Sequence, residues 1–231
     1  MKNIRLLINL YPTEPGERLD EISLCLRNNI SNPWISEIVV LDEGFPKKEL
    51  LRDAKVQIHP ISQRPNFSDF YDHLDPVGIN LISNNDIWFD KSLKKISWLG
   101  LNRYDLICLT RREPDGTLYK PEKGDAQDSW IFFDKPEPLK SCNFPMGIPG
   151  CENRLAFLFF IKRYRALNPS KVIRAMHEHR SGNRSYQSAN RIQGPYLFSK
   201  PVGLVAFHFW RLILKFLQGF RILLVKELPE A

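Results

Sequence analysis

Residues 79–90 read Ile-Asn-Leu-Ile-Ser-Asn-Asn-Asp-Ile-Trp-Phe-Asp, an apolar run that passes into amides and one carboxylate. The run predicts a buried strand over residues 78–83, followed directly by Asn84, Asn85 and Asp86. A carboxylate fixed at a strand end is well placed to hold a divalent cation, because Mg²⁺ and Mn²⁺ need few protein oxygens when they also bind substrate phosphates. The competing interpretation is an ordinary turn, since Asn and Asp favour turns and helix caps.

The segments on either side of this strand alternate between strand and helix patterns. Short apolar runs predict strands, and apolar residues at three- and four-residue steps predict helices. The predicted strands are residues 2–10, 36–41, 56–61, 105–110 and 128–133, and the predicted helices are residues 17–30, 67–74, 91–100 and 151–164. The alternation predicts an α/β fold with a parallel type of sheet. Because ligands of such sheets collect beyond the carboxyl ends of the strands, we expect chemistry at Asn9, Tyr11, Asp42 and residues 84–86.

The composition is that of one globular domain. The chain has 231 residues, of which 43% are hydrophobic and 26% charged, which excludes disordered, collagen-like and coiled-coil proteins. Its four cysteines form no C-x-x-C pair, and residues 1–10 lack the apolar core of a secretory signal. We therefore expect a cytoplasmic protein with reduced thiols.

Two histidines stand close together in the segment 176–180, which reads Met-His-Glu-His-Arg. If this segment is a strand, His177 and His179 share one face. Imidazole is a common metal ligand, but a solvated histidine pair fits the same pattern. The arginines around it are candidates for binding a diphosphate through charge-assisted hydrogen bonds: Arg174, Arg180 and Arg184.

Two acids stand in unusual settings. Asp128 precedes Ser-Trp, and Glu152 follows Pro-Gly-Cys at the start of a predicted helix. Desolvation near apolar groups raises the pKa of a carboxyl group towards values that suit a general base. Glu152 has the rival role of a helix-start acid, and Asp128 the rival role of an ion-pair partner for Arg111 or Arg112.

Several short blocks occur in an order that is more specific than any one of them. They are residues 38–44 (Ile-Val-Val-Leu-Asp-Glu-Gly), Arg64 with Phe67 and Phe70, residues 83–87 (Ser-Asn-Asn-Asp-Ile), residues 127–132 (Gln-Asp-Ser-Trp-Ile-Phe), residues 150–154 (Gly-Cys-Glu-Asn-Arg) and His177-x-His179. With these blocks, about residues 4–186 resemble the nucleotide-diphosphosugar glycosyltransferases of GT-A type, more narrowly a small branch found in bacteria and large viruses.

The resemblance implies a GT-A-like, Rossmann-type mixed sheet flanked by helices. It implies that Asp86 holds Mn²⁺ or Mg²⁺ against the diphosphate of a nucleotide-diphosphosugar donor, with His177 as a further ligand. The nucleotide-sugar contacts would come from Asn9, Tyr11, Asp42, Arg64, Asn84 and Asn85. One departure is Asn84, which stands where the family's Asp-x-Asp motif has its first acid, and an amide is a weaker metal ligand than a carboxylate.

The function that the resemblance implies is transfer of a sugar from such a donor to a glycan or lipid-linked acceptor. Asp128 or Glu152 would act as the base, and the metal and arginines would neutralise charge on the departing diphosphate. The alternative is a catalytically weak protein of the same fold that binds a nucleotide sugar or glycan, with Asn84 marking a lost metal site.

The C-terminal part carries the whole net charge of +7, because 23 basic and 23 acidic residues precede residue 171 whereas 10 basic and 3 acidic residues follow Ser170. Residues 202–226 predict an amphipathic helix whose polar residues recur every three or four positions. No apolar run in it is long enough to span a bilayer, so we expect residues 201–231 to lie on an anionic membrane surface, beside a glycosyltransferase-like domain over residues 1–200. The alternative is packing on the sheet or on a second subunit. Interleaved Leu, Ile and Val argue against nucleic acid as the partner.

Overall fold

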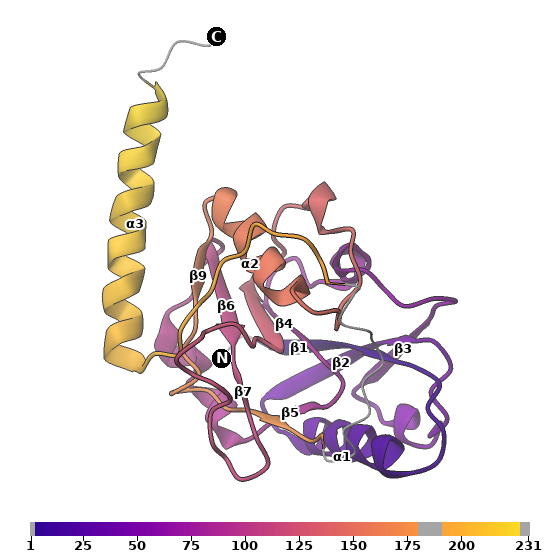
Figure 1. The fold of residues 1–231 in the computed structure, drawn as a ribbon. Helices are drawn as coiled ribbons and strands as arrows, with labels where there is room; N and C mark the ends of the chain where they lie inside the picture. Colours follow the sequence, from indigo (N-terminus) through magenta and orange to yellow (C-terminus); the bar gives the residue numbers. More distant parts are fainter. Residues whose placement is uncertain (1–2, 180–190, 227–231) are drawn as a thin grey trace.

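The structure is a computed structural model that describes residues 3–179 and 191–226, without the side chains of residues 140 and 218–226. Arg180 and Arg184, two of the arginines predicted to bind a diphosphate, lie outside the described residues. The described chain folds around a central sheet with helices on both faces and a long C-terminal helix that projects away from the body (Figure 1).

The central sheet has seven strands, and its order explains the fold class. In space they run β3 (Val56–Pro60), β2 (Ile35–Asp42), β1 (Ile4–Leu10), β4 (Ile79–Ser83), β8 (Ser129–Phe133), β6 (Asp105–Leu109) and β9 (Arg165–Leu167). The first four pair in parallel, β8 is antiparallel to both of its neighbours, and β9 is parallel to β6. The predicted α/β class with a mixed sheet is confirmed.

Strand–helix alternation predicts the parallel part of this sheet but not the direction of β8. A parallel neighbour needs a crossover connection, usually a helix, and residues 113–128 between β6 and β8 contain none. These residues instead form a loop, and Leu118 in it makes a short antiparallel bridge with Arg112. The chain therefore returns beside β6 in the antiparallel direction.

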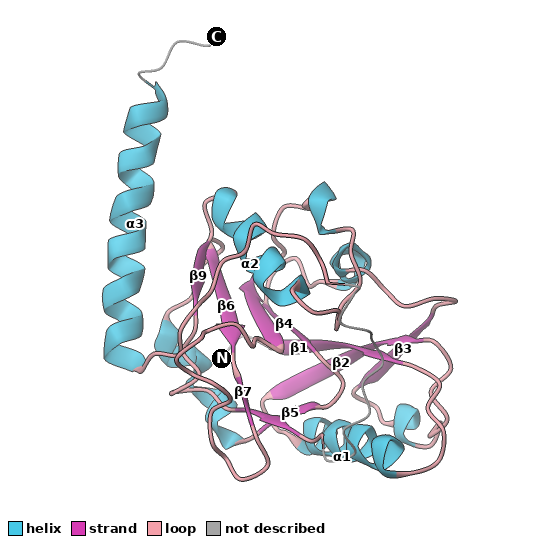
Figure 2. Cartoon of the chain, viewed as in Figure 1, coloured by secondary structure: helices cyan, strands magenta, loops and turns pink. Residues whose placement is uncertain are grey.

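The helices are α1 (Glu17–Ser31), α2 (Cys151–Ile161) and α3 (Leu204–Lys226), with 3-10 helices η1 (Leu50–Arg52), η2 (Phe67–His73), η3 (Lys91–Leu99) and η4 (Lys140–Cys142). The predicted helices at residues 67–74 and 91–100 are thus helical but tighter than α-helices. Two separate cores cover the two faces of the sheet. Figure 2 shows the helices in cyan around the magenta strands. Side chains of α1 and η3 belong to one core, and those of η2 and α2 to the other.

A second, three-stranded sheet joins segments that are distant in the sequence, two of which directly follow strands β4 and β6 of the central sheet. It consists of β5 (Ile87–Phe89), β10 (Ala175–His177) and β7 (Arg111–Arg112). β10 runs antiparallel to β5, and this register places His177 opposite Ile87. The small sheet therefore carries the histidine segment to the residue that follows Asp86.

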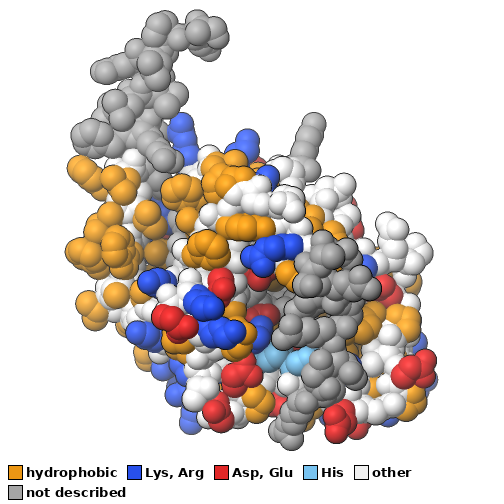
Figure 3. Space-filling model, in the orientation of Figure 1, with side chains coloured by type: hydrophobic (Ala, Val, Ile, Leu, Met, Phe, Trp, Pro, Cys, Tyr) orange, Lys and Arg blue, Asp and Glu red, His pale blue; other side chains and the backbone are white. Residues whose placement is uncertain are grey.

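Helix α3 meets the body with part of its polar side. Arg211 donates to Asp105 at 3.0 and 2.8 Å, and the ring of His208 lies 3.1 Å from the carbonyl oxygen of Trp98. Phe207 is fully buried at the base of the helix. Beside Lys215, the side chains of this helix that stay largely exposed are apolar: Val205, Phe209, Trp210, Leu212, Phe216 and Leu217. They form an apolar surface, visible as the orange side chains over α3 in Figure 3.

This arrangement differs from the predicted alternative of a helix whose apolar face packs on the sheet. Among the described side chains of α3, the buried Phe207 and the partly buried Leu204 and Leu214 pack in or against the core. None of the described helices is both long enough and apolar enough to cross a bilayer.

Candidate active site

A pocket opens at the carboxyl ends of β1 and β4, between α1, the start of β8, the start of α2 and the segment after β10. It brings together nine of the ten residues predicted from the sequence: Asn9, Tyr11, Arg64, Asn84, Asn85, Asp86, Asp128, Glu152 and His177. These residues are separated by up to 168 positions in the chain, and only the tertiary structure unites them. Their specific roles stay predictions.

Asp42 is the predicted residue that does not line the pocket. Its carboxylate accepts from the backbone N–H groups of Gly44 and Phe45, at 2.9 and 2.7 Å, and from Lys48 at 2.7 Å. Burial would raise the pKa of Asp42, but these hydrogen bonds outweigh it and lower the pKa. In this structure Asp42 caps the turn that follows β2.

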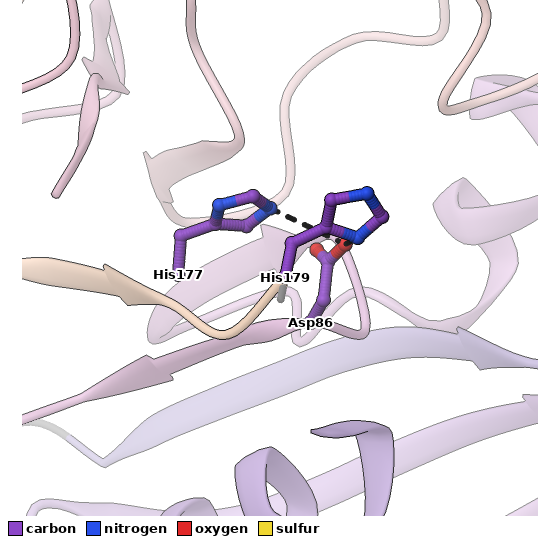
Figure 4. A group of neighbouring side chains, drawn as sticks. All are labelled: Asp86, His177 and His179. Atoms are coloured by element: carbon purple, nitrogen blue, oxygen red, sulfur yellow. Dashed lines mark ion pairs between the residues drawn. The ribbon is translucent and has the colours of Figure 1, made fainter. Parts of the chain in front are cut away.

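Three side chains form a cluster that fits a metal ion: Asp86, His177 and His179 (Figure 4). One ligand atom from each lies within 4.8 Å of the others. His177 Nε2 lies 3.5 Å from Asp86 Oδ2, and His179 Nδ1 lies 4.0 Å from the same oxygen. The two imidazole rings stack with their centroids 5.4 Å apart. One carboxylate and two imidazoles form a ligand set that divalent transition metals accept.

The backbone explains how the cluster forms. The pairing of β10 with β5 places His177 beside Asp86, and the Glu178 N–H continues it by donating to the Asp86 carbonyl at 2.9 Å. Because side chains alternate in an extended segment, His177 and His179 both face the carboxylate while Glu178 points elsewhere. The predicted shared face of the two histidines is confirmed.

Unpartnered polar atoms concentrate in this pocket. Within the described residues, six buried side-chain polar atoms lack a hydrogen-bond partner, and four of them belong to pocket residues: Asp86 Oδ1, Gln127 Oε1, Trp130 Nε1 and His177 Nδ1. Buried polar groups are nearly always paired in native proteins. The concentration indicates that a polar ligand or ion completes the pocket.

Arg18 contacts the cluster directly. It extends from the first turn of α1, where its guanidinium donates to Asp86 Oδ2 at 2.9 Å and lies 2.9 Å from His179 Nδ1. Burial alone would raise the pKa of Asp86, but His177 and Arg18 outweigh burial and hold that pKa well below its usual range. Asp86 is therefore a carboxylate at neutral pH.

Asn84 and Asp128 lie on the other side of the pocket. The Asn84 amide donates to Asp128 Oδ1 at 2.9 Å, and Arg111 lies 3.3 Å from Asp128 Oδ2. Of the two ion-pair partners predicted for Asp128, Arg111 and Arg112, it is Arg111 that contacts it in the structure. The Arg111 guanidinium also stacks over Tyr119 at 4.0 Å, which fixes it at the pocket wall.

Glu152 lies in the first turn of α2 and lines the same pocket. Burial raises its pKa to about 7, and the negative charge of Asp128 contributes to the increase. A carboxyl group with this pKa is divided between its acid and base forms near neutral pH, which suits proton transfer.

The comparisons with solved structures address the fold. A mannosyltransferase from Pyrobaculum calidifontis, solved with GDP-Man and Mn²⁺, superimposes with a TM-score of 0.54 at 16% identity, over 78% of this chain and 58% of that one. The chain has the GT-A-type fold. At this identity the likeness establishes the fold alone, and this chain spans less than two thirds of that structure's length.

Two other solved structures match with lower TM-scores. The 4-diphosphocytidyl-2C-methyl-D-erythritol synthase from Anaerococcus prevotii covers 82% of this chain and 94% of its own length, at 15% identity and a TM-score of 0.46. S. aureus TarS covers 57% of this chain at 9% identity and a TM-score of 0.41. No family model and no curated protein sequence matches the chain.

Sequence reasoning missed Arg18 as a residue of the pocket. One signal was present, because a basic residue in the first turn of a helix opposes the helix dipole and requires a compensating contact. Here that contact is the carboxylate of Asp86, supplied by the neighbouring strand end. In the GT-A-type fold of this chain, the N-terminus of α1 follows the first strand and therefore opens onto the same pocket.

Proposed function

We propose that this protein is a glycosyltransferase that uses a nucleotide-diphosphosugar donor, a divalent metal ion and a glycan or lipid-linked acceptor. The observation that carries the proposal is the convergence, in one pocket of a GT-A-type fold, of the Asp86–His177–His179 cluster and a carboxyl group with a pKa near 7. A binding protein without catalysis has no need of such a carboxyl group.

The metal cluster and the arginines of the pocket would both act on the diphosphate of the donor. Bound at Asp86, His177 and His179, a divalent ion supplies charge neutralisation for the departing diphosphate. Arg18, Arg64 and Arg111 line the same pocket and offer charge-assisted hydrogen bonds to phosphate oxygens. Their charge is in place before reaction, so stabilising the leaving group requires little reorganisation.

Glu152 is the better candidate for the base. Asp128 already accepts hydrogen bonds from Asn84 and Arg111, which occupy both of its carboxylate oxygens. Glu152 has the raised pKa, so it accepts a proton from an acceptor hydroxyl more readily. We assign the base to Glu152 and a positioning role to Asp128.

The ligand set favours Mn²⁺ over Mg²⁺. Two of the three candidate ligands are imidazole nitrogens, whereas Mg²⁺ prefers an all-oxygen shell. The Mn²⁺ in the Pyrobaculum calidifontis mannosyltransferase is in line with this preference.

One experiment distinguishes a glycosyltransferase from a protein that only binds a nucleotide sugar. The protein is incubated with Mn²⁺ and a panel of nucleotide sugars with simple glycan and lipid-phosphate acceptors, and the nucleoside diphosphate released is measured beside the thermal shift. We expect release with one nucleotide class, lost in Asp86→Ala and kept in the control Asp115→Ala, which changes an exposed loop acid. A thermal shift without release in any combination would support the binding-protein alternative, and full activity of Asp86→Ala would contradict the role of the cluster.

We further propose that α3 holds the enzyme on an anionic membrane surface, on the cytoplasmic side. Its outward side chains are apolar and aromatic, Lys215 is exposed among them, and the C-terminal part of the chain is strongly basic. Exposed Trp98 and Tyr104 near the base of the helix lie under Lys95 and Arg103, at 5.5 and 4.8 Å. Aromatic side chains beside cations suit the headgroup region, where a lipid-linked acceptor would be found.

A further inference from the structure

Arg18 occupies the position that a metal ion bound by the cluster would need. One guanidinium nitrogen lies 2.9 Å from His179 Nδ1, and another lies 2.9 Å from Asp86 Oδ2. Arginine is a donor only and stays charged in proteins. His179 Nδ1 therefore accepts the hydrogen bond, and the ring carries its proton on Nε2.

This hydrogen bond excludes a metal bond at the same nitrogen. An imidazole nitrogen without a proton has a single lone pair in the plane of the ring. The lone pair of His179 Nδ1 accepts either an N–H of Arg18 or a metal ion. The guanidinium also lies against Asp86 Oδ2, the oxygen that is 3.5 Å from His177 Nε2 and 4.0 Å from His179 Nδ1, so its positive charge stands beside this second ligand atom.

Arg18 has other acceptors within reach. Its guanidinium lies 3.2 Å from Glu21 Oε2, 3.3 Å from the Tyr11 hydroxyl and 3.5 Å from Asn85 Oδ1. Tyr11 and Asn85 line the pocket, so a guanidinium that leaves Asp86 and His179 stays at its wall.

We propose that Arg18 is an intramolecular competitor of the divalent ion. Metal binding to Asp86 Oδ2 and His179 Nδ1 displaces the guanidinium, which then binds an oxygen of the donor diphosphate in the same pocket. The second step rests on the proposed function, whereas the competition itself requires only the metal. The exchange keeps positive charge beside Asp86 in both states and couples metal loading to the release of a phosphate-binding side chain.

The competition is tested with Mn²⁺ alone. Free Mn²⁺ is titrated with wild-type protein and with Arg18→Gln, and its paramagnetic resonance signal gives the dissociation constant without any nucleotide. Removing a cation that lies against the ligands should tighten Mn²⁺ binding about tenfold or more, which corresponds to about 1.4 kcal/mol. The control Arg64→Gln removes one positive charge from the same pocket without freeing either ligand atom, so we expect a change several times smaller.

The remaining outcomes are also decisive. In the double variant Arg18→Gln/His179→Ala the gain should disappear, because the freed lone pair is absent. Equal or weaker Mn²⁺ binding by Arg18→Gln, an equal gain in Arg64→Gln, or no Mn²⁺ binding by any variant would overturn the proposal. If Arg18→Gln fails to fold, Arg18→Lys is used, because its shorter side chain carries one nitrogen group and cannot contact both ligands in the same way. No nucleotide enters the measurement, so failure to find a sugar donor would leave its result intact.

Discussion

The Asn84 side chain donates a hydrogen bond to Asp128 Oδ1 at 2.9 Å, and its backbone N–H donates to the Asp128 carbonyl at 3.0 Å. The two residues extend the pairing of β4 with β8 by one step beyond Ser83 and Ser129. The amide of Asn84 therefore supplies a donor for the carboxylate of Asp128, whereas an aspartate at position 84 would place a second carboxylate against the first. This contact gives Asn84 a structural role in the place where the Asp-x-Asp motif has an acid.

We expect Asn84→Asp to destabilise the protein. Two carboxylates at hydrogen-bond distance repel each other, so the free energy of unfolding at pH 7 should fall by about 1–3 kcal/mol. The loss should shrink as the pH falls towards about 4, because the repulsion makes one carboxyl group of the folded variant take up a proton at a higher pH than in the unfolded chain. Urea unfolding measures both effects, with the exposed Asn143→Asp as control. A gain in Mn²⁺ affinity without any loss of stability would contradict this role of Asn84.

Glu152 should give a pH-dependent stability difference between the wild-type protein and Glu152→Gln. Burial raises its pKa from 4.5 to about 7 in the folded protein, so the folded state disfavours the ionised form. The cost is absent below about pH 4.5, develops between 4.5 and 7, and is fully present above pH 7. Glu152→Gln should therefore gain up to about 3 kcal/mol relative to the wild type as the pH rises through this range.

The same residue should control the rate of transfer. If Glu152 is the base, the wild-type rate rises with pH through about 7, as the carboxyl group loses its proton. Glu152→Gln should lose about 10² to 10⁴ in rate and the ascending limb of the pH profile. A rate profile of Glu152→Gln that keeps the wild-type shape would assign the base elsewhere, with Asp128 as the next candidate.

The histidines should make the metal site selective. We expect Mn²⁺ to raise the melting temperature more than Mg²⁺ at equal concentration, because two candidate ligands are nitrogens. His177→Ala and His179→Ala should each remove most of the Mn²⁺ effect. His59→Ala is the matched control, since the ring of His59 packs against that of His73 and does not line the pocket. Equal shifts with Mg²⁺ and Mn²⁺ in all variants would exclude these imidazoles as ligands.

The exposed apolar surface of α3 should determine binding to membranes. Phe209 and Trp210 are 58% and 48% exposed, so replacing both with Ala should leave the unfolding transition nearly unchanged. Binding to vesicles with anionic lipid should weaken about tenfold or more, because a buried aromatic side chain contributes about 1.5–3 kcal/mol. Co-sedimentation measures this, and Leu24→Ala is the control because Leu24 is exposed on α1. Equal binding of both variants, or wild-type binding to neutral vesicles alone, would point to a different partner for this surface.

The fold class followed from local patterns. The strands near residues 4–10, 35–42 and 79–83 are short apolar runs, and α1 repeats apolar residues at helical steps. Such periodicity depends on which face of an element is buried, so it is readable without knowing the neighbours. The rule that ligands collect at strand ends then placed Asn9 and Asp86 in one site before any contact was known.

The sequence by itself determined the elements, the strand ends with their amides and carboxylate, and the amphipathic C-terminal helix. Tertiary structure alone decided that β10 pairs with β5, that Arg18 reaches Asp86, and that Arg211 turns the polar side of α3 towards Asp105. The physical reason is separation along the chain. Local periodicity reports burial within one element, whereas the arginine contacts join residues 68 and 106 positions apart, and the paired strands β5 and β10 are also far apart in the sequence. Which partner meets which depends on the path of the whole backbone, and no single segment encodes it.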